Sequence, residues 1–240
     1  INRVKEGLKD LSVSRTSFNW GIPLANDPTH VIYVWFDALI NYLSGVDYPG
    51  AKFKKFWPAD IHLIGKDILW FHSVIWPTML FSAGIEPPKK IFVHGFINTA
   101  LGEKLSKTTG TIIDPLELSE KYGADAVRYF LLREIPLGED GNFSIDALVE
   151  RHNRELANDL GNLVNRALSL AERKLSNTVP DAKTDAALSE KLDLKKIRAH
   201  MDSLETHSAL AEIFSFVSAC NKYVNDKEPW KLEGKDAQKV

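Results

Sequence analysis

The sequence is poor in cysteine and has no long apolar run. Its 240 residues include one cysteine, Cys220, which excludes an internal disulfide framework and any zinc site built from several cysteines of this chain. The most apolar run, residues 68–83, contains His72 and Pro77 and is shorter than the ~20 residues that a membrane span needs. We therefore expect no membrane partner, and the low cysteine content fits a reducing compartment, which predicts a cytoplasmic protein.

An excess of either charge is also missing. The chain carries 30 Lys and Arg against 32 Asp and Glu, a formal net charge of −2. A nucleic-acid partner would therefore be bound by particular placed residues and not by a general positive field. What the sequence does contain is 44% hydrophobic residues, with 12 Phe, 6 Trp and 6 Tyr, which is enough to build a folded core.

The first part of the chain has the pattern of an α/β sheet. Residues 31–36, 61–64 and 91–93 are short apolar runs, as expected of buried parallel strands. A helical pattern over residues 67–83 separates the second run from the third. This β-α-β order predicts an α/β fold for the first part of the chain.

The second part of the chain has the pattern of a helical bundle. A long helix is predicted from a cap at Ser144 or Asp146 to about residue 174, followed by helical patterns over residues 194–204 and 210–224. Between the two parts, we expect a Gly/Lys/Thr loop and a helix over residues 118–133. The predicted fold class is therefore α/β followed by all-α.

Polar and aromatic residues follow each of the three apolar runs. Ligands of open α/β sheets bind beyond the carboxyl ends of the strands, so we expect these residues to gather at one rim. For any one of them, an ordinary role as a strand-end turn residue is the alternative. The residues are Trp35, Asp37, Asn41 and Tyr42 after the first run, Gly65, Lys66, Asp67 and His72 after the second, and His94 and Gly95 after the third.

A loop with two lysines is the second candidate for chemistry. Lys104 and Lys107 are three residues apart, with Ser106 between them and Thr108 after them. Such a loop can neutralise phosphate oxygens as charge develops during phosphoryl chemistry. The alternative is an ordinary solvated loop, and the spacing alone favours that reading.

Several segments together resemble a known family. The segment EKLSKT at residues 103–108 resembles the KMSKS signature of class I aminoacyl-tRNA synthetases, with Leu105 and Thr108 in place of the commoner Met and Ser. The segment GKDILWFH at residues 65–72 matches the GxDxxxxH pattern of the same class. Further segments are similar to the methionyl-tRNA synthetases in particular: VWFDALINY at 34–42, WPTM at 76–79, HG at 94–95, GADAVRY at 123–129, NLVNR at 162–166 and PW at 229–230.

The resemblance implies a domain organisation. The HIGH motif of the class is not found around any of the seven histidines, and the cysteine-bearing zinc insertion of the family is missing. We therefore expect the C-terminal part of a synthetase, which by itself would be inactive. Its regions would be residues 1–93, the second half of a Rossmann-type nucleotide-binding fold; residues 94–145, the KMSKS and stem-contact region; and residues 146–240, a helical anticodon-binding bundle.

The resemblance also implies a reaction. Family members activate methionine with ATP and Mg²⁺ to methionyl-adenylate and then transfer methionine to the 3′ end of its tRNA. Lys104 and Lys107 would be the catalytic pair, and Asp67 would accept hydrogen bonds from the ATP ribose. No metal site is expected in the chain itself. The ATP-binding set implied by the resemblance is Gly65, Asp67, His94, Gly95, Lys104, Ser106 and Lys107.

Two more residue sets follow from the resemblance. The methionine pocket would contain Trp35, Ala38, Tyr42, Ile68, His72 and Trp76, since a thioether favours aromatic edges. Anticodon bases would be read by Asn162 and Arg166, which share a helix face, and would stack on Trp230. Without the resemblance, His72 would be read as a core histidine and Trp230 as a side chain that seals the end of the bundle.

Two alternatives of other kinds remain. The first is a tRNA-binding module that has lost catalysis, although retention of both lysines and Asp67 is not typical of one. The second is a class I synthetase for another aliphatic amino acid. Trp35, Tyr42 and the anticodon set argue against this second alternative.

Overall fold

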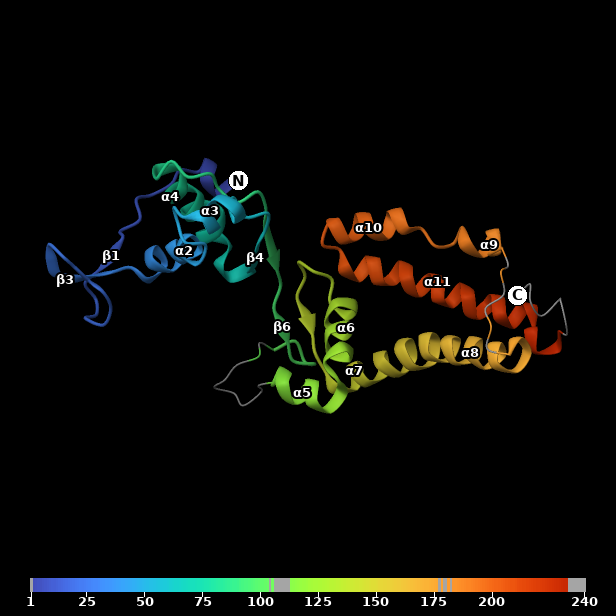
Figure 1. Cartoon of the computed structure of the whole chain (residues 1–240). Coiled ribbons are helices and arrows are strands. Elements are labelled where there is room, and N and C mark those ends of the chain that lie inside the picture. Colours follow the sequence, from blue (N-terminus) through green and yellow to red (C-terminus); the bar gives the residue numbers. More distant parts are fainter. Residues whose placement is uncertain are drawn as a thin grey trace. The chain divides into compact units, whose positions relative to one another are not determined.

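The computed structural model describes residues 2–103, 105, 113–176, 178, 181 and 183–232 (Figure 1). The chain divides into two compact units, Ile1–Val93 and His94–Val240, and each is described by itself. Along the part of the chain that the structure describes, no helix is both long and apolar enough to cross a membrane.

The first unit opens with a short helix and a small antiparallel sheet. After α1 (Asn2–Lys5) come β1 (Ser14–Arg15), β2 (Pro23–Leu24) and β3 (Asp27–Ile32). The strands lie in the order β1-β3-β2, with Ser14 opposite Ile32 and Pro23 opposite Val31.

The parallel strand predicted for residues 31–36 is therefore wrong. β3 ends at Ile32, and helix α2 (Val34–Gly45) begins two residues later. The run of β-branched and aromatic residues favoured a strand, but Leu39 and Leu43, which are four residues apart, are both buried against the core. Burial of one helix face overrides the local preference of the first residues.

The remaining elements of the first unit hold the two strands that the sequence predicts. They are α3 (Ala51–Phe56), β4 (His62–Gly65), the 3₁₀ turn η1 (Lys66–Ile68), the π-helix η2 (Phe71–Ile75), α4 (Trp76–Ser82) and β5 (Ile91–His94). β4 and β5 form a two-stranded sheet, which confirms the strands predicted at 61–64 and 91–93.

The helix predicted over residues 67–83 is present but is not regular. Pro77 has no N–H to donate to the preceding turn, and that turn is the π-helix η2. The Thr78 hydroxyl donates to the Val74 carbonyl at 2.8 Å, which satisfies an acceptor in the widened turn. The wide turn ends at Trp76, one of the most buried side chains of the unit.

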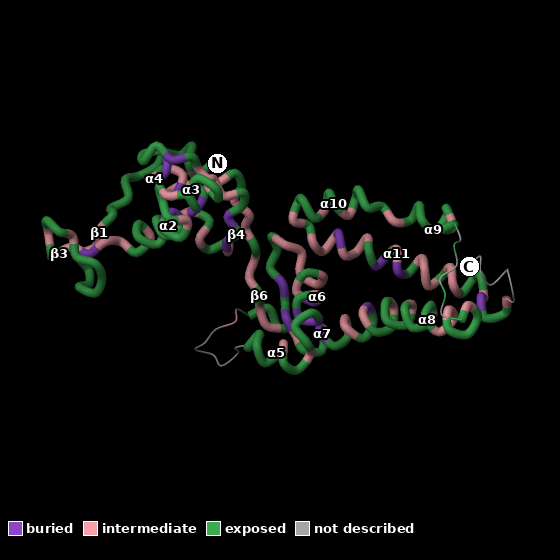
Figure 2. Tube along the Cα trace, in the orientation of Figure 1, coloured by how far each residue is buried: buried purple, intermediate pink, exposed green. Residues whose placement is uncertain are grey.

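Helices α2 and α4 enclose the core of the first unit. Leu39 and Leu43 of α2 pack with Trp76 and Leu80 of α4 and with Ile85. Figure 2 shows most of the buried stretches of this unit on its helices and on β4, with a further one on β3. The same two helices carry most of the residues predicted to bind methionine, so the core positions the candidate site directly.

The second unit begins with two short parallel strands and two helices. β6 (Ile97–Asn98) pairs with β7 (Gly141–Asn142), and α5 (Pro115–Tyr122) precedes α6 (Ala124–Glu134). The single helix predicted over residues 118–133 is therefore wrong. Gly123 interrupts it with φ +86°, a conformation that side chains with a Cβ disfavour.

The helical half of the second unit agrees with the sequence pattern. α7 (Ile145–Arg151), a π-helix η4 (His152–Gly161) and α8 (Asn162–Leu175) form one continuous helical segment. The Ser144 hydroxyl caps it by accepting from the Ala147 N–H at 3.1 Å. A short helix α9 (Ala186–Ser189), which was not predicted, precedes α10 (Leu194–Asp202), α11 (Thr206–Lys227) and the 3₁₀ turn η5 (Pro229–Lys231).

A buried carboxylate joins α6 to the long helical segment. Glu155 of η4 is 5% exposed and accepts hydrogen bonds from the Tyr129 hydroxyl, from Arg133 at 3.2 Å and from Arg151 at 2.7 Å. The Tyr129 ring also lies 5.4 Å from the Phe214 ring of α11. These contacts make α6, η4 and α11 parts of one compact unit.

Candidate functional site

The first unit gathers aromatic rings and imidazoles from four elements. We define the aromatic–imidazole cluster as Trp35, Tyr42, Trp57, His62, His72 and Trp76. Tyr42 of α2 is at its centre, with ring centroids 4.3 Å from His62, 5.6 Å from His72 and 6.0 Å from Trp76. Trp35 meets His72 edge-on at 6.1 Å, and Trp57 meets Trp76 at 6.2 Å.

Hydrogen bonds fix the orientation of His72. Its Nδ1 lies 3.0 Å from the Ile68 carbonyl oxygen, which can only accept, so Nδ1 carries a proton and donates. Its Nε2 lies 2.8 Å from the Tyr42 hydroxyl, and in the neutral imidazole this nitrogen accepts from the hydroxyl. His72 itself is 1% exposed, so both partners are needed to satisfy its ring.

Burial favours the uncharged forms of His62 and Tyr42. It lowers the pKa of His62, as does any charge on His72, and it raises the pKa of the Tyr42 hydroxyl. Two buried atoms of the cluster, His62 Nδ1 and Trp76 Nε1, have no hydrogen-bond partner among the residues that the structure describes. A neutral, aromatic and weakly polar surface is suited to a thioether side chain.

The structure brings together most of the residues predicted to bind methionine. Trp35, Tyr42, His72 and Trp76 contact one another, and Ile68 takes part through its carbonyl oxygen. Ala38 is exposed on α2 between Trp35 and Tyr42.

Sequence reasoning missed His62, Trp57 and Phe71. The Phe71 ring stacks on Trp35 with centroids 4.3 Å apart. Phe71 directly precedes His72 in the segment GKDILWFH, and His62 is the first residue of β4. A local sequence pattern could therefore have identified both residues. Trp57 joins through a tertiary contact that no local pattern indicates.

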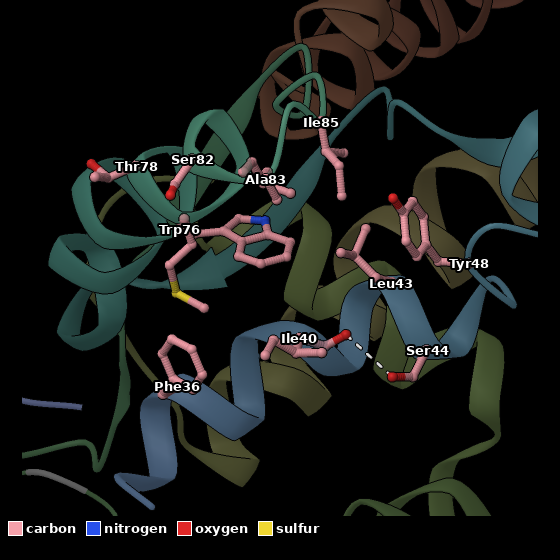
Figure 3. A pocket seen from close by; sticks show the side chains of 12 residues that line it. Phe36, Ile40, Leu43, Ser44, Tyr48, Trp76, Thr78, Ser82, Ala83 and Ile85 are labelled. Atoms are coloured by element: carbon pink, nitrogen blue, oxygen red, sulfur yellow. Dashed lines mark hydrogen bonds between the residues drawn. The ribbon is translucent and has the colours of Figure 1, made fainter. Parts of the chain in front are cut away.

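Two cavities flank the cluster. The first, of about 660 Å³, lies between α2 and α4, where Phe36, Ile40 and Leu43 face Trp76 (Figure 3). The second, of about 310 Å³, is lined by Trp35, Trp70 and Ile75 among others. Trp76 and Trp35 are thus the members of the predicted methionine set that border these two cavities.

The residues predicted to bind ATP lie in both units. Gly65 ends β4, and Asp67 is exposed in η1 directly after it. His94 and Gly95 open the second unit, where the His94 Nδ1 donates to the Gly95 carbonyl at 2.9 Å. Lys104, Ser106, Lys107 and Thr108 lie outside the described residues.

One expectation about this rim changes with the structure. The rim of three parallel strands is wrong, because the first run belongs to the separate β1-β3-β2 sheet and Asp37 and Asn41 lie on α2. Gly95 has a local packing reason as well, since a Cβ at this position would clash with the Glu139 carbonyl oxygen.

The second unit places two of the three predicted anticodon residues together. The Arg166 guanidinium of α8 donates to the Asn225 side-chain oxygen at 2.7 Å and lies 5.7 Å from the Trp230 ring centroid. Trp230 is 44% exposed on η5, and Asn162 is exposed one turn before Arg166 on α8. Asn225 was missed, although Asn221 and Asn225 form a polar pair four residues apart in the last turns of α11.

The described residues contain no group of three or more His, Cys, Asp or Glu side chains that could hold a metal ion. The polar groups at the two candidate sites are hydroxyl, imidazole, amide, indole and guanidinium groups. Such groups bind by hydrogen bonding, stacking and charge, and these are the means by which an amino acid and unpaired bases are recognised.

Comparison with known proteins shows which family this chain belongs to. Residues 1–168 match the family described as "tRNA synthetases class I (M)". "Methionine--tRNA ligase" of Mycobacterium tuberculosis (strain ATCC 25618 / H37Rv) is 48% identical over 247 residues, which are 99% of this chain and 47% of that protein. The enzyme of the same name from Caldanaerobacter subterraneus is also 48% identical, over 100% of this chain and 39% of its own length.

Solved structures give the same result. The crystal structure of Mycobacterium tuberculosis methionyl-tRNA synthetase bound by methionyl-adenylate has a TM-score of 0.89 at 47% identity, over 99% of this chain and 49% of that one. The free form of that enzyme has a TM-score of 0.85 at 44% identity. This chain spans about half the length of the first curated relatives that it matches. The family match covers more than half of this chain, and the chain therefore belongs to the class I tRNA synthetases of the M type.

Proposed function

We propose that this chain is part of a methionine–tRNA ligase. The enzyme activates methionine with ATP to form methionyl-adenylate and pyrophosphate, and then transfers the methionyl group to the 3′-terminal ribose of its tRNA. The observation that carries the proposal is the pairing of Tyr42 with His72 inside an aromatic cluster, in a chain of the class I M family. That pairing supplies an aromatic, weakly polar surface for the methionine side chain.

The aromatic–imidazole cluster supports a methionine pocket in the first unit. A thioether cannot be selected by charge, so selectivity has to come from shape and from weak contacts of sulfur with rings and polar hydrogens. Trp35, Tyr42 and Trp76 present rings, and His72 is held in one orientation by Ile68 and Tyr42. Ala38, one turn from Tyr42 on α2, leaves room beside them.

ATP is the proposed second substrate. Asp67 is exposed directly after Gly65 and is assigned to the ribose hydroxyls, while His94 and Gly95 are assigned to the adenine. Lys104 and Lys107, with Ser106, are assigned to the phosphates. Neutralising the charge that develops there by one such contact typically lowers the barrier by ~2.7–4 kcal/mol. Mg²⁺ is proposed to accompany the ATP phosphates.

The tRNA is the proposed third substrate, and its anticodon is assigned to the end of the helical segment. Arg166 and Asn162 offer donors and acceptors for base edges, and Trp230 offers a partly exposed plane for stacking. The region from residue 146 onward is accordingly proposed as the anticodon-binding bundle, and residues 94–145 as the KMSKS and stem-contact region. Residues 1–93 are proposed as the second half of the nucleotide-binding fold.

Amino-acid-dependent ATP–pyrophosphate exchange tests the proposal. A protein extended to the full length of its relatives should exchange with methionine and not with leucine or valine. Exchange with another aliphatic amino acid would assign a different synthetase. Binding of tRNA with no exchange for any amino acid would identify a binding module without catalysis. The 240-residue chain alone should show no exchange, because we propose that half of the ATP site lies outside it.

A further inference from the structure

The segment between β1 and β2 exposes large aromatic side chains. Trp20 is 88% exposed, Phe18 is 49% exposed and Ile22 is 55% exposed. Together with Asn19, Val34 and Asp37 they line an open hollow of about 810 Å³. Exposed aromatic surface of this kind marks a binding site more often than a chance feature of a soluble protein.

Helix α2 connects this hollow to the aromatic–imidazole cluster. Val34 and Asp37, in its first turn, border the hollow, whereas Trp35 and Tyr42 of the same helix belong to the cluster. The two sites are within about two turns of each other along the helix, and a turn rises ~5.4 Å. A ligand in the hollow therefore lies close to the group that occupies the cluster.

The chemistry of the lining is that of a reader of unpaired bases. Trp20 and Phe18 offer stacking planes, and a base face of any kind can stack on them. The Asn19 amide both donates and accepts, and the Asp37 carboxylate accepts. Across residues 2–103, neither of these two side chains makes a hydrogen bond, so both are available to a ligand.

The lining also contains no cation. A site for the phosphate backbone would need Lys or Arg, and none of the lining residues is one. A carboxylate instead favours bases with exocyclic amino groups, which are cytosine, adenine and guanine but not uracil. The unpaired 3′ end of a tRNA reads C-C-A, so all three of its bases carry such a group.

We infer that the hollow formed by Phe18, Trp20 and Asp37 binds the unpaired 3′-terminal nucleotides of the tRNA. Trp20 stacks on one base, and Asp37 accepts from an exocyclic amino group. This inference rests on the proposed function, because the 3′-terminal ribose has to reach the methionyl group for transfer. Neither the aromatic–imidazole cluster nor the anticodon site provides a position for the 3′ end of the tRNA. The hollow provides that position.

Binding of short RNA hairpins to the 240-residue chain tests the inference. One hairpin carries a 3′ overhang ACCA, a second is the same stem with a blunt end, and a third carries the methionine anticodon CAU in its loop. Trp20→Ala should weaken binding of the overhang hairpin about 5- to 150-fold, the usual worth of one stacked base. Trp20→Phe retains a stacking plane and should restore most of the affinity.

Three controls separate stacking from other causes. Tyr48→Ala removes a comparably exposed ring on the first cavity and should leave all three affinities unchanged. The salt dependence of overhang binding should be the same for Trp20→Ala as for the wild type, since stacking releases no counter-ions. Replacing both overhang cytosines by uridine should weaken wild-type binding about fivefold or more, and should have no effect in Asp37→Ala.

The inference is overturned if Trp20→Ala binds the overhang hairpin as the wild type does, which would leave the hollow as a contact for another protein segment. Equal weakening of the blunt hairpin, or wild-type binding that does not need the overhang, also overturns it. In these cases the CAU hairpin should still bind and depend on Trp230, so the proposed function survives. Loss of wild-type binding to all three hairpins would instead count against the proposed function.

Discussion

At the scale of single residues, the hydrogen bond between Tyr42 and His72 is the central contact of the candidate methionine site. The imidazole is almost fully buried, and its two ring nitrogens are satisfied by one backbone carbonyl and one hydroxyl. A side chain held in this way cannot turn without losing a hydrogen bond. The pair is therefore fixed in one arrangement, and discrimination by shape requires side chains that are fixed in this way.

Tyr42→Phe removes that hydroxyl and nothing else. Loss of one hydrogen bond typically costs ~0.5–1.5 kcal/mol, so the KM for methionine of a complete synthetase should rise several-fold in ATP–pyrophosphate exchange. Tyr48→Phe is the matched control, because Tyr48 borders the first cavity and not the cluster. An unchanged KM in Tyr42→Phe would separate this hydroxyl from methionine recognition.

Trp230→Ala tests the anticodon site. The ring is partly exposed next to the Arg166 guanidinium, so its removal should weaken binding to a CAU hairpin by ~1–3 kcal/mol, the range for a stacked base. Titration of a fluorescent hairpin measures the effect. Affinity equal to the wild type would remove Trp230 from the site and leave it as a cover for the bundle end.

At the scale of elements, the junction of α6 with η4 depends on one buried carboxylate. Burial would raise the pKa of Glu155, but hydrogen bonds from Tyr129 and Arg151 and the charges of Arg133 and Arg151 lower it overall. The ionised form is therefore the one that the fold stabilises. This stability is present above the pKa of an unfolded Glu, about 4.3, and is lost as the pH falls through the lowered pKa.

Glu155→Gln should destabilise the second unit strongly. Arg133 and Arg151, whose side chains are 14% and 16% exposed, would be left without their shared charge, and breaking such a buried pair typically costs ~3–5 kcal/mol. Urea unfolding at pH 7 measures this, with the exposed Glu150→Gln of α7 as control. As the pH falls below about 5, the wild type should lose stability more steeply than Glu155→Gln; parallel curves would contradict the assignment.

The break between α5 and α6 depends on backbone conformation alone. Gly123 has φ +86°, and a Cβ there would meet nothing within 4 Å. Gly123→Ala should therefore destabilise by ~1–3 kcal/mol through strain. Gly45→Ala, at the end of α2 with equally open space, should stabilise by ~0.4–1 kcal/mol instead. Denaturant midpoints of the two variants should move in opposite directions.

At the scale of the whole molecule, the chain consists of two compact units. The first contains the aromatic–imidazole cluster, and the second contains the candidate anticodon site. Arg166 contacts Asn225 and Trp230, and all three residues lie in the second unit. Residues 94–240 expressed by themselves should therefore bind the CAU hairpin within about twofold of the whole chain, as expected for independent sites. A much larger loss of affinity would mean that residues before 94 contribute to anticodon binding.

Much of the architecture could be predicted from local patterns. The strands at 62–65 and 91–94, the Ser144 cap and the three helices of the second part follow from apolar periodicity and capping chemistry. The errors have physical causes that act at a distance. Most of the strand predicted over 31–36 belongs instead to α2, because Leu39 and Leu43 of that helix are buried against α4. The single helix predicted over 118–133 is two helices, because Gly123 between them has a positive φ.

The site was predictable to the extent that its residues stand in recognisable segments. The sequence by itself determined the family resemblance and the order of the α/β and helical parts. It also identified Tyr42, His72, Trp76 and Trp230 as candidate site residues. These predictions depend only on residue type and spacing. Only the tertiary structure decided that His62 and Trp57 join the cluster, that Asn225 meets Arg166, and that Trp20 borders a hollow next to α2. Contacts between residues distant along the chain depend on how elements pack, and packing leaves no local period in the sequence.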